Sequence, residues 1–388
     1  MGLFQPEHRN VLKATYAADH EAYAEALESL ATFLDAEVAP RSAGFDATAG
    51  GIDESRRKLF EQGLCRMPFE PPEGMSFPFG VYSLAMELVA SADAPTAMSM
   101  GIHCTVAEGI RRFGSEHLRD SFVPDLVSGK KLAAFSLTEP SSGSDAKSMS
   151  TRAVRAGSNY IINGSKMFIT NAGEADVYMV FAATERGHSA FLVDNTNPGL
   201  LAGEDIPKLG MRGSRTAEVR FEDCTVPADR LVGEDGKGFE YVKTMLNGSR
   251  IIMGSICVGI ARTAYSKALA YSQQRDLFKQ RLADLPINRE KVANMRTEIT
   301  AGRLLCLYAS RLKELGLDYA SEAAQAKVLS TEMAARVCDQ VVQIFAGYGY
   351  TNPEIHRHWR DARLLTIGEG TSEVLRLLIA SKEFAGSR

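Results

Sequence analysis

Several features that mark particular classes of protein are missing from this sequence. Its six cysteines are scattered with no CxxC pair, which excludes the disulfide framework of a small secreted domain and predicts reduced thiols. No run of like charge accompanies the net charge of -4, so nucleic acid is not an expected partner. The sequence has no stretch of about 18 uncharged apolar residues, so membrane insertion is not predicted. We therefore expect a soluble protein, cytoplasmic in a bacterium or archaeon, or in the mitochondrial matrix of a eukaryote after processing.

With 388 residues, of which 45% are hydrophobic, the chain is long enough for two or three packed units. Apolar residues at spacings of three and four indicate helices in the first third of the chain. Short alternating runs separated by turn residues then indicate strands, and helical spacing returns afterwards. These patterns predict an α+β, mainly helical fold with a helical domain over 1–130, an antiparallel β domain over 131–235 and a helical bundle over 236–388.

Two local patterns are more specific. Asn163-Gly164 lies between the apolar runs YII and MFI and is the strongest hairpin signal of the β region, because a type I′ turn requires positive φ at both central residues. Between 320 and 345, two apolar stripes run along one predicted helix. We expect this helix to be buried on two sides, by its own bundle and by another subunit.

Three motifs then indicate a family. The first is FSLTEPSSGSD over 135–145, where the β region begins, and the second is RDLF over 275–278, after the first long helix of the last region. The third pairs QIFAGYGY over 343–350 with RDARLLTIGEGTSE over 360–373. Together and in this order they closely resemble the acyl-CoA dehydrogenases, and the resemblance covers nearly the whole chain. It implies that the middle domain is barrel-like and that the C-terminal domain is a four-helix bundle.

Oxidation of a Cα–Cβ bond beside a thioester requires a base for the α-proton, an acceptor for the β-hydride and stabilisation of charge on the carbonyl oxygen. No amino-acid side chain accepts hydride, so a cofactor is required, and the resemblance implies FAD. It implies Glu369 as the catalytic base, a role that suits a carboxylate whose pKa is raised by desolvation. The Glu369 N–H would hold the thioester oxygen, and Gly370 would let the substrate approach closely. The alternative is a helix start capped by Thr371 and Ser372.

The neighbours of this base carry further expectations. In some relatives the base lies on the first long helix, immediately before an arginine, and Ser249 occupies that position here, so Glu369 has no obvious competitor. Gly368 stands where tyrosine is frequent, and we therefore expect a roomier acyl pocket. The resemblance places Arg250 near the substrate and Asn247 near CoA, although Arg250 could instead be a surface residue of an amphipathic helix.

The β domain is expected to line the flavin. The loop TEPSSGSD offers hydroxyls and free backbone N–H groups to the flavin and the pyrophosphate, although a plain turn between strands is the alternative. Phe168 stands where the family has a tryptophan that covers the flavin, and a core aromatic is its alternative. Ser144 is also expected near the CoA arm. The cofactor contacts that the resemblance implies on this domain are Phe135, Leu137, Thr138, Gly143, Ser144, Phe168, Ile169 and Thr170.

The C-terminal region is expected to complete the FAD site of a neighbouring subunit. Arg275 would pair with the pyrophosphate and Phe278 would pack near the adenine. The other cofactor contacts implied in this region are Gln343, Gly347, Thr371 and Glu373. Departures from the family pattern concentrate here and leave the FAD affinity open: Lys279 and Ala346 replace glycines, and Pro286 stands where glutamine is frequent.

The resemblance implies an acyl-CoA thioester as substrate, an electron-transferring flavoprotein as electron acceptor and a homotetramer built as a dimer of dimers. Three alternatives stay open: a dehydrogenase of acyl chains on a carrier protein, an acyl-CoA oxidase, and a catalytically silent scaffold, against which Glu369 argues. Acyl chain length and branching are not predicted. No metal site is expected, because His356 and His358 lack a third ligand at helical spacing and are expected to be exposed or capping residues.

Overall fold

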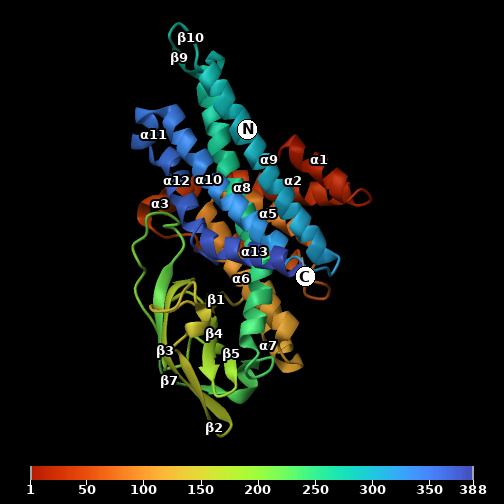
Figure 1. The fold of residues 1–388 in the computed structure, drawn as a ribbon, viewed down its shortest axis with the longest axis vertical. Coiled ribbons are helices and arrows are strands. Elements are labelled where there is room, and N and C mark those ends of the chain that lie inside the picture. Colours follow the sequence, from red (N-terminus) through yellow and green to blue (C-terminus); the bar gives the residue numbers. More distant parts are fainter. Residues whose placement is uncertain (1, 387–388) are drawn as a thin grey trace.

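The computed structural model describes residues 2–386. Figure 1 shows helices from the first part of the chain beside a sheet at the lower end of the view, with the long helices of the last part rising above them. The first region holds α1 (Pro6–Thr15), α2 (His20–Glu37), α3 (Ser42–Thr48), α4 (Asp53–Glu61), α5 (Phe79–Ala92), α6 (Ala94–Phe113) and α7 (Glu116–Val127), with short 3₁₀ turns at Ala39–Arg41 and Leu64–Arg66.

Local sequence explains how α5 and α6 are separated. The backbone of Asp93 is extended, and its side chain accepts a hydrogen bond of 2.9 Å from the Thr96 N–H, so Asp93 caps α6. Pro95 follows in the first turn, where a missing N–H costs no helical hydrogen bond. Every residue of α5 is buried, because α2, α6, α8 and α9 pack around it. The helix α5 therefore forms the centre of the N-terminal region.

The middle region is one sheet with the strand order β6-β7-β3-β2-β4-β5-β8 and with β1 beside β4. Most neighbours are antiparallel, as expected, but β1 runs parallel to β4 and β2 touches β4 in parallel, so the sheet is mixed. Its strands are β1 (Ala133–Ser136), β2 (Arg152–Ala156), β3 (Asn159–Thr170), β4 (Val177–Thr184), β5 (Gly187–Asp194), β6 (Leu200–Ala202), β7 (Thr216–Pro227) and β8 (Leu231–Val232), with 3₁₀ turns at Ala146–Ser148 and Ala228–Arg230.

The hairpin predicted at Asn163-Gly164 is wrong. The strand β3 passes through both residues, and its pairing with β7 shifts register there. Asn163 donates to Asp223 of β7 at 3.2 Å, and Gly164 adopts a φ of 148°, so the glycine serves a β-bulge. The chain turns instead at residues 157–158, between β2 and β3, where Gly157 has a φ of 62°. Both the bulge at Gly164 and the turn at Gly157 need a glycine. Only the pairing with the partner strand shows which of the two is the turn.

The last region is again helical, and α8 runs from the sheet to the far end of the molecule (Figure 1). A small hairpin of β9 (Asp276–Leu277) and β10 (Gln280–Arg281) projects at that end, followed by a 3₁₀ turn at Leu282–Asp284. The helices are α8 (Gly238–Gln274), α9 (Pro286–Glu314), α10 (Ala320–Phe345), α11 (Gly347–Thr351), α12 (Pro353–Leu365) and α13 (Ser372–Gly386).

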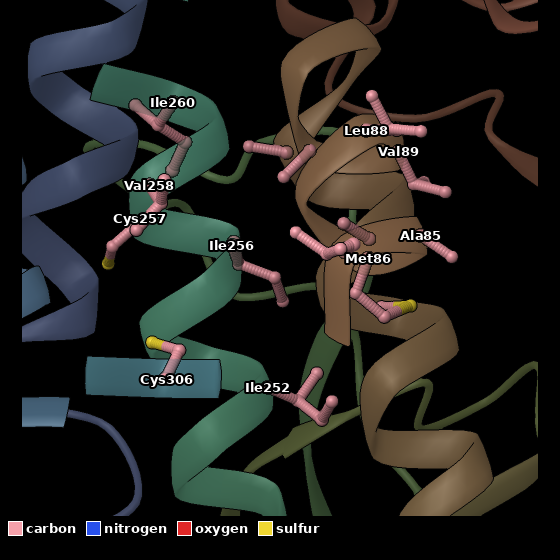
Figure 2. Close-up of a cluster of buried hydrophobic side chains, with 14 of the residues drawn as sticks. Ala85, Met86, Leu88, Val89, Ile252, Ile256, Cys257, Val258, Ile260 and Cys306 are labelled. Carbon is pink, nitrogen blue, oxygen red and sulfur yellow. The ribbon is translucent and has the colours of Figure 1, made fainter. Parts of the chain in front are cut away.

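The helix α8 joins both helical regions into one core. Ile252 and Ile256 point from α8 toward Met86 on α5, and Cys257 and Cys306 lie on its other side (Figure 2). Within residues 2–386, α8 alone is long and apolar enough to span a membrane by length and composition. Its apolar window is 83% buried inside the protein, which is the environment of a core helix. Burial of this surface is the main stabilising contribution to the bundle.

The helix α10 packs against α8, α9, α12 and α13. Val337 and Val341 are buried, while Val328, Val342 and Phe345 are only partly covered. Burial of the remaining surface by another subunit stays a prediction. The fold class is confirmed: a helical N-terminal domain, a β-sheet domain and a helical C-terminal domain follow one another along the chain.

Candidate active site

Glu369 lies in the tight turn that joins α12 to α13. Its backbone is left-handed, with a φ of 56°, and Gly370 follows with a φ of 99°. A non-glycine residue in this region is uncommon, and such strain is characteristic of functional sites. The Lys327 ammonium group on α10 donates to the Gly370 carbonyl at 2.7 Å, and the Thr371 hydroxyl accepts from the Val374 N–H at 3.4 Å. Thr371 thus caps α13, and the turn is held from both sides.

The two oxygens of the Glu369 carboxylate have different environments. Oε1 accepts a hydrogen bond of 2.7 Å from the Ser249 hydroxyl on α8. Oε2 is closed off from solvent and has no hydrogen-bond partner within residues 2–386, although the residue as a whole is only half-buried. Burial raises the pKa of Glu369, and it outweighs the Ser249 hydrogen bond and the charges of Arg250 and Lys327, which lower the pKa. This combination suits a carboxylate that must accept a proton.

Two cations flank the carboxylate. Lys327 is fully buried, and burial lowers its pKa to about 8. Arg250 is half-buried, so it is not the surface residue that we held as an alternative. The Arg250 guanidinium group donates to the side-chain amide oxygen Oδ1 of Asn247 at 2.8 Å, and its Nε is buried without a partner in the described part of the chain. The structure therefore brings Asn247, Arg250 and Glu369 into one neighbourhood.

The loop after β1 is anchored by a buried ion pair. The Lys166 ammonium group lies 2.8 Å from Glu139 and also donates to the Leu137 carbonyl at 3.0 Å. Glu139 further accepts hydrogen bonds from Ser150 and Thr151. Burial raises the pKa of Glu139, but these donors outweigh it and lower the pKa to about 2. The anchored loop leaves Gly143 and Ser144 exposed to solvent, with their polar groups available to a ligand.

Phe168 is exposed on the surface of the β domain. Its side chain is 63% exposed and its φ is 60°, which is a genuine outlier for a bulky residue on a strand. The Met167 N–H donates to the Thr138 carbonyl at 2.8 Å, so Phe168 lies beside the anchored loop. Ile169 is 2% exposed and packs into the sheet core, so only its backbone can meet a ligand. Phe135 and Thr170 are partly covered.

These residues fit FAD. An exposed aromatic ring on strained backbone offers a flat apolar surface to an isoalloxazine, and the neighbouring loop offers hydroxyl groups and free N–H groups to its carbonyls and to a pyrophosphate. The loop between β6 and β7 contacts the helix that leads to Glu369, since the Met211 N–H in this loop donates to Asp361 of α12 at 2.5 Å. The β-domain residues and the Glu369 turn are thus parts of one assembly.

The remaining predicted cofactor residues lie elsewhere. Arg275 and Phe278 lie in the β9–β10 hairpin, at the opposite end of the molecule from the sheet (Figure 1), and Phe278 is 80% exposed. Gln343 and Gly347, at the junction of α10 and α11, are also exposed. Glu373 is exposed in the first turn of α13. The hairpin cannot reach the sheet of its own chain.

The structure shows the backbone at the three positions that depart from the family pattern, and at two of them the change introduces strain. Lys279 has a φ of 62° at the hairpin turn, and Ala346 has a φ of 53° between α10 and α11. Both replace a glycine of the family pattern at a position where only glycine is unstrained. Pro286 is the first residue of α9, where proline is favoured.

Sequence reasoning missed the contacts made by Lys327 and by the Glu139–Lys166 pair. A lysine between Ala326 and Val328, on a helix that is apolar on two sides, was the available signal for Lys327. The expectation that His358 is exposed or capping is wrong: it is 6% exposed, and burial lowers its pKa well below the usual value. Across residues 2–386, no group of three or more histidine, cysteine, aspartate or glutamate side chains has the arrangement of a metal site.

Fold and site together define a class: a flavin-dependent oxidoreductase with a carboxylate of raised pKa in a strained turn between two helices. The family model for the acyl-CoA dehydrogenase N-terminal domain matches residues 20–130, that for the middle domain matches 134–224, and that for the C-terminal domain matches 236–383. The chain belongs to the acyl-CoA dehydrogenase family, and FAD is its cofactor.

Individual relatives agree with this assignment. The mitochondrial short-chain specific acyl-CoA dehydrogenase of Homo sapiens is 38% identical over 364 residues, which cover 91% of this chain and 88% of that protein. Butyryl-CoA dehydrogenase from Megasphaera elsdenii superposes with a TM-score of 0.91 at 35% identity, covering 93% of this chain and 98% of the other. Glutaryl-CoA dehydrogenase from Mycobacterium smegmatis, in complex with FADH2, has a TM-score of 0.88 at 28% identity and covers 98% and 95%.

Proposed function

We propose that this enzyme converts a short acyl-CoA thioester to the trans-2-enoyl-CoA, with Glu369 removing the α-proton. The observation that carries this proposal is the asymmetry of the Glu369 carboxylate, in which Oε1 is held by Ser249 and Oε2 is buried without a partner in the described chain. A raised pKa brings the base closer to the working pH, which favours proton transfer. A short acyl chain is supported by the names of the human and Megasphaera relatives.

Each residue at the turn has a distinct task in this proposal. Ser249 fixes the orientation of the carboxylate, so that Oε2 meets the substrate Cα and takes its proton. The Glu369 N–H polarises the thioester oxygen, and Lys327 holds the Gly370 carbonyl so that this turn keeps its shape. Arg250 and Asn247 bind the substrate beside it. FAD, held by Phe168, Thr138, Ser144 and their neighbours, supplies the hydride acceptor when bound.

The test is anaerobic bleaching of the flavin with butyryl-CoA and with a butyryl acyl-carrier protein. The wild type should bleach with the CoA thioester, while Glu369→Gln should stay yellow and keep its FAD. The matched control is Glu298→Gln, which alters a partly exposed glutamate of α9 that pairs with Arg336, and it should bleach normally. Normal bleaching by Glu369→Gln would remove Glu369 from its role, and bleaching with the carrier protein alone would change the substrate class.

We propose an electron-transferring flavoprotein as the physiological electron acceptor, as the family resemblance implies. Turnover of butyryl-CoA should then depend on added electron-transferring flavoprotein and should be slow with O₂. Stoichiometric release of hydrogen peroxide in air, at the rate seen with the flavoprotein, would instead favour an oxidase.

We further propose that the enzyme is a homotetramer, built as a dimer of dimers, in which the hairpin of one subunit completes the FAD site of another. The support is the exposure of Phe278 at a hairpin far from the sheet of its own chain. Exposed apolar side chains on the helices that follow the hairpin include Ile287, Leu304, Tyr308, Tyr348, Tyr350, Leu377 and Phe384. Light scattering should give four times the chain mass, and a monomer that retains FAD would contradict the proposal.

A further inference from the structure

The strand β3 carries a bulge at Phe168. Lys166 pairs with Val219 of β7. The next pair, Ile169 with Ala217, leaves two residues of β3 opposite one residue of β7. Such a bulge re-aims a side chain and is common beside active sites. Because the φ of Phe168 is 60°, this strained backbone persists only if the structure around it holds the bulge on both sides.

The side of the bulge that comes first in the chain is held by the loop after β1. The Lys166 ammonium group is bound to Glu139 and to the Leu137 carbonyl, and the Met167 N–H donates to the Thr138 carbonyl. These contacts fasten β3 to the loop just before Phe168. They do not reach the residues that follow Phe168, so a second group has to hold that side.

Asn171, the residue after β3, is that group. It is fully buried, and its amide oxygen accepts a hydrogen bond of 2.6 Å from the Ser99 hydroxyl of α6. Its amide nitrogen donates to the carbonyls of Ser99 at 3.2 Å and Ala133 at 3.0 Å, so both of its N–H donors are used. The φ of Asn171 is 68°, a conformation in which asparagine is enriched. The Asn171 N–H donates to the Arg215 carbonyl at 2.9 Å.

The Asn171 amide joins the two segments of the sheet that carry the expected flavin contacts. Ala133 is the first residue of β1, which leads into the loop after β1, and Asn171 directly follows the segment 168–170. Two N-terminal helices brace this junction. Arg56 of α4 donates to the Ser99 hydroxyl at 3.2 Å and to Glu174, in the turn after Asn171, at 2.7 Å. A change at Asn171 therefore displaces β1 and β3 relative to each other.

We infer that Asn171 is a positioning residue of the FAD site, whose amide holds β1 and the end of β3 together so that Thr138 and Phe168 meet the same flavin. This inference rests on the FAD contacts of Thr138 and Phe168 in the proposed function. Asn171 is fully buried by protein, so it acts through these neighbours. A displacement of about 1 Å between groups that hold a reactant can lower a rate about a hundredfold.

The test uses Asn171→Gly, which keeps the left-handed backbone and removes the amide. FAD release from the holoenzyme on dilution, followed by flavin fluorescence, should give a Kd at least about tenfold above that of wild type. The visible circular dichroism of the bound flavin should change. With butyryl-CoA and saturating FAD, kcat should fall by about tenfold or more while KM changes less.

The matched control is Asn197→Gly in the same domain. It also removes an asparagine amide that donates to a backbone carbonyl, that of Thr225 on β7, at 2.8 Å. This variant should lose some stability and keep the wild-type Kd for FAD, flavin circular dichroism and kcat. If Asn171→Gly lowers the melting temperature but leaves these three readouts at the wild-type values, Asn171 is purely structural and the inference is overturned.

A milder variant keeps the inference testable if Asn171→Gly does not fold. Ser99→Ala removes the hydroxyl that donates to the Asn171 amide oxygen. It should raise the Kd for FAD and change the flavin circular dichroism in the same direction by a smaller amount, and unchanged values would overturn the inference. These flavin readouts need no turnover. Failure of every acyl-CoA to bleach the wild-type flavin would therefore overturn the proposed reaction alone.

Discussion

Two glutamates of this molecule, the buried Glu87 and the half-buried Glu369, have pKa values shifted in opposite directions. Glu87 of α5 accepts hydrogen bonds of 2.9 and 2.7 Å from Arg303 and one of 3.0 Å from His8, and Arg262 lies 3.1 Å away. Burial alone would raise the pKa of Glu87, but these partners bring it well below its usual value. Glu369 has one hydrogen bond, and burial raises its pKa.

The difference teaches that burial does not by itself decide the charge of a carboxylate. The number of hydrogen-bond donors around the carboxylate decides whether its pKa is raised or lowered. Glu87 is saturated with donors and ties α1, α8 and α9 to α5, so it serves the structure. Glu369 keeps an oxygen without a partner in the described chain, so it can accept a proton. Variants at the two positions should therefore have opposite effects.

The largest expected effect is that of Glu87→Gln. Removal of the carboxylate leaves two buried guanidinium groups uncompensated, which should lower the free energy of unfolding by about 3–5 kcal/mol. Urea unfolding at pH 7 measures this value. The control is Glu21→Gln at the surface, which should change stability by less than about 0.5 kcal/mol. A loss no larger than that of the control would contradict the structural role of Glu87.

A smaller effect is expected for Ser249→Ala. Loss of the hydrogen bond to the ionised carboxylate should raise the pKa of Glu369 further, so the rise of kcat/KM with pH should move to higher pH. Below that rise, kcat/KM should fall by about tenfold, since hydrogen bonds to charged groups are strong. Ser266→Ala on the same helix should leave the profile unchanged. A profile that stays in place would mean that Ser249 does not act on the base.

The smallest effect should be a gain of stability in Glu369→Gln. The folded-state pKa of Glu369 lies above its ordinary value of 4.5, so its charge costs stability as the pH rises above that value. The variant should be more stable than wild type by about 0.5–2 kcal/mol at pH 7, and the gain should vanish in acid. Glu87 has the opposite sign, because its stabilisation is lost as the pH falls through its lowered pKa. If Glu369→Gln were less stable than wild type, Glu369 would stabilise the fold as Glu87 does, and the contrast between the two glutamates would fail.

Sequence could predict the part of the site that is local in the chain. Glu369, Gly370 and Thr371 form one motif, and the structure places them in one turn. Lys327 and Ser249 contact this turn across 43 and 120 residues of sequence, and such contacts depend on how the helices pack. Apolar periodicity predicts that α8 and α10 are buried helices but not which side chain faces the turn.

The fold shows the same limit. The order and type of the domains could be predicted from the spacing of apolar residues, because this spacing differs between helices and strands. The Asn163-Gly164 hairpin failed because positive φ serves a bulge as well as a turn. Phe168 was predicted at the cofactor, but its left-handed backbone was not, since nothing local favours that conformation for phenylalanine.

The most direct test of the central claim separates proton removal from oxidation. Methylthioacetyl-CoA has a sulfur atom at the β position and cannot give up a β-hydride, so only its α-protons can react. In D₂O under anaerobic conditions, wild type and Glu87→Gln, assayed where the latter is folded, should exchange these α-protons for deuterium. Glu369→Gln should exchange them at least about a hundredfold more slowly. Exchange by Glu369→Gln at the wild-type rate would contradict the assignment of Glu369 as the base.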